Sequence, residues 1–279
     1  MSPLKHLITI MQVKPDGSMR FIANPGHGGK RIYGGLIVAQ ALDATRRCCP
    51  NSFKVQSIHG QFLRPGDYDH SINIEVQVLK DGRRFKLYNV YCRQQDKIIF
   101  FATMTFHKPE ISFDHTLPAT GLELPNASFA LYYHQRDERH TSQELNGEPT
   151  SIEVRIEDKN NFHSPQTLQA RGWYKAAEKL TISEWQNTLL LAYISDWNLP
   201  SVAMRPHSVK STKSLMLASL DHTIWFYGQS NLQDWVIYLQ DTPTAKNSRG
   251  HTRGLLYSHS GELLACVNQE SFLSNYENS

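Results

Sequence analysis

One pattern occurs twice along this chain, and the repeat constrains the fold more than any other feature of the sequence. Each half contains one apolar, helix-like stretch and several strand-like runs rich in Val, Ile, Phe and Tyr. In the first half, a predicted helix over residues 32–44 precedes predicted strands over residues 55–63, 71–79, 84–92 and 98–106. In the second half, the predicted helix covers residues 184–194, and the predicted strands cover residues 151–156, 168–174, 215–226, 235–241, 251–258 and 263–272. Two copies of this unit predict a duplicated α+β fold rather than a solenoid array.

Short segments of the two halves also align with each other. Ser57-Ile58-His59 matches Ser219-Leu220-Asp221, and both halves place a turn signal between two strand-like runs, at Asp81-Gly82 and at Ser260-Gly261. Such dipeptides favour tight connections between neighbouring antiparallel strands. We therefore expect two antiparallel sheets, each wrapped on its own helix, within one chain.

The organisation along the chain follows from this repeat. We expect an N-terminal unit over residues 1–110, a connector over residues 111–150 and a C-terminal unit over residues 151–279. The connector is polar and is interrupted by several prolines, with one short helix expected near residues 128–135.

Composition excludes several classes of protein. No apolar run approaches the roughly 18 residues that a membrane-spanning helix needs, so we expect no stable membrane insertion. The 29 basic and 26 acidic residues give a net charge of +3, which suits an anionic small ligand but does not indicate nucleic-acid binding. The four cysteines have no zinc spacing, so we expect reduced thiols and no metal. The N-terminus also lacks the features of a secretory signal.

Familiar catalytic motifs are missing from the sequence. There is no Gly-x-Ser-x-Gly nucleophile elbow and no His-Glu-x-x-His zinc motif. The glycine-rich run Gly26-His27-Gly28-Gly29-Lys30 lacks the ending of a phosphate-binding loop, so we interpret it as a loop with a permissive backbone.

Three polar residues stand within or beside apolar runs of the second half. Asp196 follows the second predicted helix, while Ser219 and Gln269 lie in predicted strands. Taken singly, Asp196 suits a solvent-facing helix end, Ser219 a small buried residue and Gln269 a surface position at a strand end. Together, a carboxylate, a hydroxyl and an amide can hold and activate a water molecule that attacks an acyl carbon.

At these residues the chain resembles the acyl-CoA thioesterase II family. The resemblance covers nearly the whole chain except the connector, and its strongest blocks are Tyr33-Gly34-Gly35-Leu36-Ile37-Val38-Ala39-Gln40-Ala41-Leu42, His59-Gly60-Gln61-Phe62-Leu63-Arg64-Pro65-Gly66-Asp67, Ser195-Asp196-Trp197-Asn198-Leu199, Ser219-Leu220-Asp221-His222-Thr223-Ile224-Trp225-Phe226 and Ser248-Arg249-Gly250. The resemblance implies a double hotdog fold and hydrolysis of fatty acyl-CoA to fatty acid and CoA. It also implies a catalytic set of Asp196, Ser219 and Gln269, with serine where the family has threonine or serine.

Further expectations depend on the resemblance. Backbone N–H groups near Gly34 and Gly35, at the start of the first helix, would polarise the thioester carbonyl. His59 is a possible helper, while Gln56 stands where the family often has histidine. The basic residues Lys30, Lys246 and Arg249 are candidates for the CoA phosphates. The resemblance requires no cofactor, and it implies a homodimer or higher homo-oligomer.

The C-terminus ends without a Ser-Lys-Leu address, so we expect a cytoplasmic rather than a peroxisomal protein. Two alternatives stay open from the sequence. One is a hotdog dehydratase or hydratase that acts on acyl thioesters, and the other is a non-catalytic acyl-CoA-binding protein.

Overall fold

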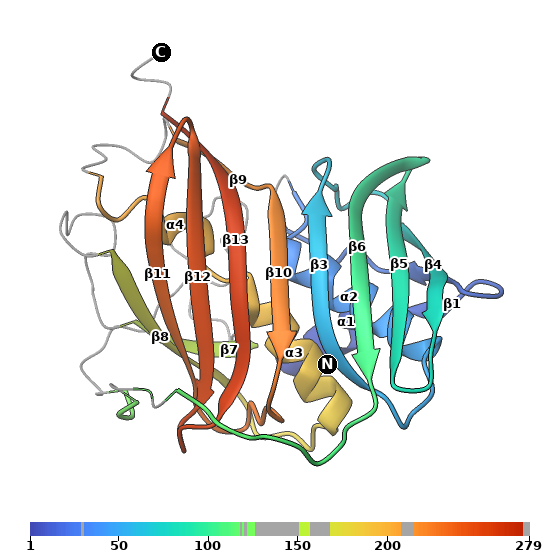
Figure 1. Ribbon diagram of the computed structural model, residues 1–279. Helices are drawn as coiled ribbons and strands as arrows, with labels where there is room; N and C mark the ends of the chain where they lie inside the picture. Colours follow the sequence, from blue (N-terminus) through green and yellow to red (C-terminus); the bar gives the residue numbers. More distant parts are fainter. Residues whose placement is uncertain are drawn as a thin grey trace.

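The computed structural model is built around one large antiparallel sheet with helices on one of its faces (Figure 1). It describes residues 1–28, 31–117, 119, 122–125, 151–156, 168–207 and 215–275. The helix expected near residues 128–135 lies outside these residues. The predicted α+β class is confirmed, while the unit boundaries near residues 110 and 150 stay a prediction.

Strands from the two halves of the chain occupy the two halves of the sheet. The first half supplies β1 (Lys14–Pro15), β2 (Arg20–Ala23), β3 (Lys54–Phe62), β4 (Ile72–Asp81), β5 (Phe85–Gln94) and β6 (Lys97–His107). The second half supplies β7 (Ile152–Ile156), β8 (Gln169–Ala176), β9 (Leu215–Ser219), β10 (Asp221–Phe226), β11 (Val236–Lys246), β12 (Arg249–Ser258) and β13 (Leu263–Asn275). The strand order is β1-β2-β4-β5-β6-β3-β10-β13-β12-β11-β8-β7, and β9 pairs with β13.

The two sheets of the predicted duplication join at a central seam. There β3 runs antiparallel to β10, with Ile58 opposite Ile224 and His59 opposite Thr223. Ile58 and Ile224 are fully buried, whereas His59 faces outward. This alternation makes one face of the seam part of the core and leaves the other accessible.

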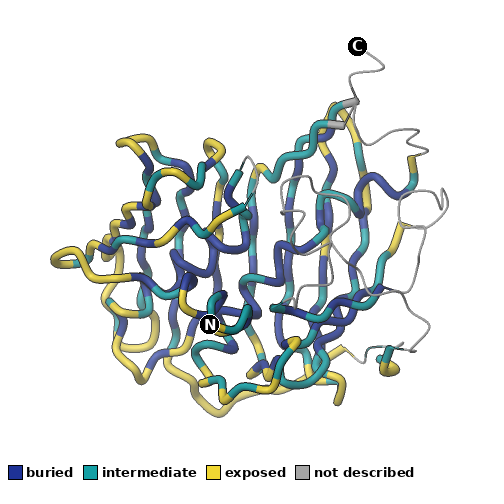
Figure 2. The backbone as a smooth tube through the Cα atoms, turned by 180° about the vertical axis from the view of Figure 1, so that it is seen from behind, coloured by how far each residue is buried: buried dark blue, intermediate teal, exposed yellow. Residues whose placement is uncertain are grey.

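The core lies between the sheet and the helices α1 (Pro3–Met11), α2 (Gly34–Arg47), α3 (Glu184–Ser195) and α4 (Leu199–Val202). Figure 2 shows the buried backbone concentrated along α2, α3 and the central strands. Helices α2 and α3 run antiparallel, because Gly35 at the start of α2 lies against Tyr193 at the end of α3, and Asp43 near the end of α2 contacts Trp185 at the start of α3. Each helix of the repeat therefore packs on the other as well as on the sheet.

Several elements differ from the sequence prediction, which contained neither β1 and β2 nor α4. Helix α1 was not expected, although Pro3 suits the first helical turn and Leu4, Leu7 and Met11 form a buried face. The strand expected over residues 215–226 is divided at Leu220 into β9 and β10. Since β10 pairs with both β3 and β13, while β9 pairs with β13 alone, the division marks where the second-half strand leaves the seam.

Among the described residues, no helix combines the length and the apolar character needed to cross a membrane.

Candidate active site

Asp196 lies where the end of α3 packs beside the start of α2. It is the C-cap of α3 and only 6% exposed, and its carboxyl faces the first residues of α2. A carboxylate at a helix C-terminus is unfavourable, but one at a helix N-terminus is favoured by free N–H groups and by the helix dipole. The start of α2 thus stabilises a charge that the end of α3 would oppose, and the solvent-facing alternative for Asp196 is wrong.

Gly34 and Gly35 permit this close approach. A Cβ atom on Gly34 would lie 2.6 Å from Oδ2 of Asp196 and 2.8 Å from the ring of Phe62. A Cβ atom on Gly35 would lie 2.3 Å from the carbonyl oxygen of Tyr193. All three distances are far below normal contact, so larger side chains would push the two helix ends apart.

The environment of Asp196 alters its acidity. Burial raises the pKa of its carboxyl to about 7, while the Gly35 backbone N–H and the Gln269 side chain act in the opposite direction. Oδ1 of Asp196 is buried and has no hydrogen-bond partner among the described residues. The group is therefore able to gain and lose a proton near neutral pH, and one of its oxygens is free to accept a hydrogen bond.

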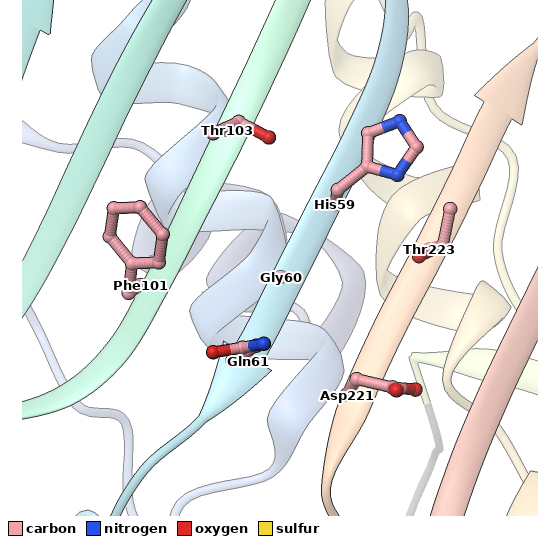
Figure 3. A pocket seen from close by; sticks show the side chains of 7 residues that line it. All are labelled: His59, Gly60, Gln61, Phe101, Thr103, Asp221 and Thr223. Carbon is pink, nitrogen blue, oxygen red and sulfur yellow. The ribbon is translucent and has the colours of Figure 1, made fainter.

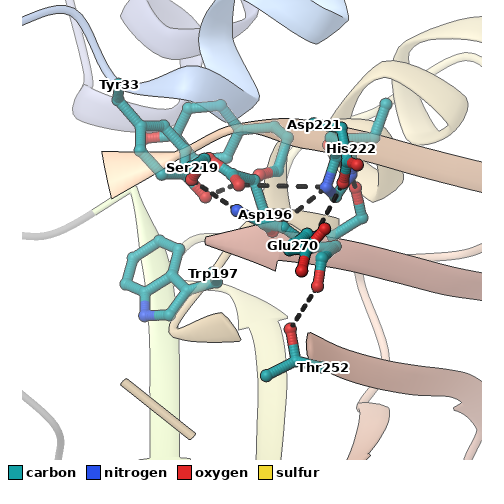
Figure 4. A network of polar contacts seen from close by, with 12 residues as sticks. Tyr33, Asp196, Trp197, Ser219, Asp221, His222, Thr252 and Glu270 are labelled. Carbon is teal, nitrogen blue, oxygen red and sulfur yellow. Dashed lines mark hydrogen bonds and ion pairs between the residues drawn. The ribbon is translucent and has the colours of Figure 1, made fainter. Parts of the chain in front are cut away.

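Ser219 and Gln269 join Asp196 from the sheet. Gln269 lies on β13 in the inward-facing register with Val267 and Ser271, and it is fully buried, so the surface alternative for this residue is wrong. Its Nε2 donates to Oγ of half-buried Ser219 at the end of β9. The structure thus brings the three residues singled out in the sequence into one cluster (Figure 4).

The cluster also contains His222, to which sequence reasoning gave no role. It is fully buried on β10, with Nδ1 3.3 Å from Oε1 of Gln269 and 3.9 Å from Oδ1 of Asp196. Its Nε2 lies 2.8 Å from Oγ of Ser195. A signal was present, because the two-residue alternation of β10 places His222 on the same inward face as Ile224.

Aromatic rings surround the cluster on the helix side. Tyr33 packs edge-on against Tyr193 and Trp197, with ring centroids 4.9 and 6.2 Å away. The Tyr33 hydroxyl donates to the Tyr193 carbonyl at 2.9 Å, which ties the segment before α2 to the end of α3. Burial is the physical cause of the raised pKa of the Asp196 carboxyl.

Other residues singled out in the sequence lie apart from this cluster. His59 lines a polar pocket on the sheet face opposite the helices, next to Thr103 and Thr223 (Figure 3), and its ring packs against Trp225. Lys246 and Arg249 are exposed at the β11–β12 hairpin, and Arg249 pairs with Glu270 at 3.3 Å. Lys30 lies outside the described residues.

The described part of the chain contains no group of His, Cys, Asp and Glu side chains arranged to hold a metal ion.

The first half holds its own buried carboxylate in a different setting. Asp43 on α2 accepts from the Val13 backbone N–H at 2.9 Å, from Trp185 Nε1 at 2.8 Å and from Arg47 at 2.9 Å. Both oxygens are thus engaged, and Arg47 supplies the compensating charge. Asp43 has the bonding of a structural residue, in contrast to Asp196.

Comparison with known proteins gives consistent results for both halves. A family model described as acyl-CoA thioesterase matches residues 141–272, and one described as acyl-CoA thioesterase N-terminal domain matches residues 23–107. The chain is 29% identical over 253 residues to acyl-CoA thioesterase 2 of Haemophilus influenzae, covering 88% of each chain.

Solved structures share the fold. A crystal structure of an acyl-CoA thioesterase II from Mycobacterium marinum aligns with a TM-score of 0.81 at 23% identity, covering 98% of this chain and 100% of that chain. A protein of unknown function with a hot dog fold from Alicyclobacillus acidocaldarius aligns with a TM-score of 0.78 at 15% identity, covering 96% and 98%. The arrangement of two helices on one long sheet is accordingly a double hotdog fold.

Proposed function

The chain belongs to the acyl-CoA thioesterase II family, and on that premise we propose that it hydrolyses acyl-CoA thioesters with Asp196, Ser219 and Gln269 as its catalytic residues. The observation that carries the assignment is the buried Asp196 carboxyl, which has a pKa of about 7 and an oxygen with no hydrogen-bond partner among the described residues. A carboxyl with a pKa near 7 is partly ionised at neutral pH, and its ionised form can accept a proton from water.

The proposed step uses water directly. Oδ1 of Asp196 accepts a proton from a water molecule, which the hydroxyl of Ser219 and the amide of Gln269 orient. The water oxygen forms a bond to the thioester carbonyl carbon, and the C–S bond then breaks. The acid and the CoA thiolate are released, and the proton held by Asp196 returns to the thiolate or to solvent. No covalent acyl-enzyme intermediate is required.

We propose that a backbone N–H group at the start of α2 donates a hydrogen bond to the carbonyl oxygen of the bound thioester. The N–H groups of Leu36 and Ile37 already donate to the Tyr33 carbonyl, and the Gly35 N–H faces Asp196. The Gly34 N–H is therefore the donor that we assign to the carbonyl oxygen of the thioester. The positive end of the α2 dipole adds to its effect on developing negative charge.

Arg249 and Lys246 remain our candidates for the CoA phosphates, because both are exposed cations at one hairpin. Replacing Arg249 by Ala should raise KM and leave kcat unchanged, since a remote phosphate contact contributes to binding in the ground and transition states alike.

We further propose a reducing, cytoplasmic setting and a homo-oligomeric state. The four cysteines are free, and burial raises the pKa of the thiols of Cys48 and Cys266. Half-buried Tyr91, Phe101 and Trp225 give the outer sheet face an apolar component suited to self-association. Light scattering on the purified protein measures the mass that decides between monomer and oligomer.

The decisive experiment is free-thiol release from acyl-CoAs of C4 to C18 by wild type and by Asp196→Asn. The asparagine keeps the shape of the side chain but cannot accept the proton. We expect the wild type to release CoA and the variant to lose about 10²-fold or more of kcat. The panel also measures the chain-length preference.

Ser219→Thr and Ser219→Ala form the matched pair for the hydroxyl. The threonine variant should retain activity, whereas the alanine variant should lose it. Equal release by wild type and Asp196→Asn would overturn the role of Asp196. Hydration of an enoyl-CoA without thiol release would instead favour the dehydratase alternative.

A further inference from the structure

His222 is a buried histidine in contact with the proposed catalytic residues, yet the hydrolytic step leaves it without a task. Burial lowers the pKa of its imidazole to about 4, with the Gln269 contact acting the other way. The ring is therefore neutral at neutral pH and carries one N–H, on either Nδ1 or Nε2.

The partner of Nδ1 decides which nitrogen carries the proton. Nδ1 faces Oε1 of Gln269, since the other end of that amide, Nε2, donates to Ser219. A carbonyl oxygen only accepts hydrogen bonds, so a favourable contact requires the proton on Nδ1. Nε2 is then an acceptor for the hydroxyl of Ser195, which lies 2.8 Å from Nε2 and 2.8 Å from the Ala192 carbonyl oxygen and shares its single proton between them.

The opposite tautomer of His222, with the proton on Nε2, is unfavourable at its contact with Gln269. If Ser195 donated instead to the Ala192 carbonyl, which is also 2.8 Å away, Nε2 of His222 would carry the proton and Nδ1 would be an acceptor. Two acceptors would then face each other, unless the Gln269 amide rotated by half a turn. That rotation would direct the amide oxygen toward Ser219, whose hydroxyl can also donate, and toward the Asp196 carboxylate, which only accepts hydrogen bonds and would lose its Gln269 donor.

We propose that His222 is a positioning residue, which donates from Nδ1 to Oε1 of Gln269 and thereby holds the amide NH₂ toward Ser219 and Asp196. This inference rests on the proposed function, in which Gln269 orients the attacking water. The hydrogen-bond chain runs from Ser195 at the end of α3, through β10 and β13, to Ser219 on β9. Residues on β9, β10 and β13 thus fix the orientation of the Gln269 side-chain amide.

The first test is the tautomer of His222 in the folded wild-type protein. Long-range ¹H–¹⁵N correlation spectra distinguish protonated from unprotonated ring nitrogens, and the signals that vanish in His222→Asn assign this ring among the 13 histidines. We expect the Nδ1–H form. The Nε2–H form would overturn the proposal, whether or not the protein hydrolyses thioesters.

The second test uses two variants that each keep one half of the ring's contacts. His222→Asn places an amide nitrogen near the position of Nδ1 and retains the donor to Gln269. His222→Gln places its amide near the position of Nε2, so it retains a contact with Ser195 but offers no donor to Gln269. For both variants, kcat and KM are measured together with the midpoint of unfolding.

We expect His222→Asn to stay within about fivefold of the wild-type kcat, and His222→Gln to lose about tenfold to hundredfold with little change in KM, because a misdirected water lowers the rate and not the binding. Equal losses in both variants would mean a purely structural role and would overturn the proposal. Wild-type protein that shows the Nδ1–H tautomer but releases no thiol would contradict the proposed function and leave the geometry of His222 intact.

Discussion

Two buried aspartates in this molecule differ in what surrounds them. Asp43 has both oxygens hydrogen bonded and a cation beside it, whereas Asp196 has a free oxygen and no cation within its cluster of described residues. Three donors, one of them the Arg47 guanidinium, contact the carboxyl of Asp43, while burial raises the pKa of the Asp196 carboxyl. The same residue type therefore has a structural role in the first half and, in our proposal, a catalytic role in the second half.

The acidity of Asp196 predicts the pH dependence of hydrolysis. Only the ionised carboxyl accepts a proton from water, and its pKa is raised to about 7 by burial. We expect kcat/KM to rise as pH increases through about 7 and then to level off. Initial rates of thiol release between pH 5 and pH 9 measure this. A profile that is flat from pH 5 upward would exclude Asp196 as the base.

The same shift predicts that Asp196 costs stability. Between about pH 4 and pH 7 the native carboxyl holds a proton that the unfolded chain has already lost, so this group destabilises the fold progressively as pH rises through that range. Asp196→Asn should therefore be more stable than wild type at pH 8, and the difference should shrink toward pH 4. Urea unfolding at pH 4 and pH 8 measures the free energies of unfolding of both proteins. Between about pH 4 and pH 7 their difference should change by about 1 kcal/mol per pH unit.

At the scale of elements, the site exists because two helix ends meet without intervening side chains. The start of α2 provides N–H groups and a dipole, the end of α3 provides the carboxylate, and glycines at positions 34 and 35 allow contact between them. The sheet contributes the remaining residues through inward positions of β10 and β13. Each element alone carries only part of the chemistry.

The glycines at the start of α2 should tolerate no added methyl group. In Gly34→Ala, the new Cβ would meet Oδ2 of Asp196 at 2.6 Å and would displace the carboxyl from Ser219 and Gln269. We expect kcat to fall by about 10²-fold, because small displacements of catalytic groups are costly. Thiol release and circular dichroism together separate this loss from misfolding. Wild-type activity in the variant would show that the carboxyl position is not critical.

At the scale of the whole molecule, Asp43 links parts of the chain that are far apart in sequence. Its carboxyl bonds the backbone after α1, the side chain of Arg47 on α2 and the indole of Trp185 on α3. Because α1 and α2 come from the first half and α3 from the second, this residue connects the two units on the helix side. The β3–β10 pairing connects them on the sheet side.

Asp43→Ala should accordingly destabilise the protein while sparing the chemistry. Removing one partner of a buried charged network costs about 3 kcal/mol. We expect the urea midpoint to fall and kcat in the folded protein to stay near wild type. Asp241→Ala is the matched control, because Asp241 pairs with Arg253 at the surface and should cost about 1 kcal/mol or less. Equal losses in the two variants would contradict the structural role of Asp43.

The sequence by itself determined the local elements and the duplication. The alternation of apolar residues predicted β3, β4, β5, β6, β12 and β13 to within a few residues, since a strand's two-residue period is a local property. The family blocks pointed to Asp196, Ser219 and Gln269 by position. Helix α1 and the division at Leu220 were not predicted from the sequence, because both depend on which surface is available for packing.

Only the tertiary structure decided which residues come into contact and how those contacts change acidity and hydrogen bonding. The position of Asp196 at the N-terminus of α2, its raised pKa and its distance from His222 arise from antiparallel helix packing and from strand register. These contacts join residues that are far apart in the sequence, and no local pattern specifies their geometry. Acidity and hydrogen-bond direction depend on burial and on neighbours, so they are properties of the folded molecule.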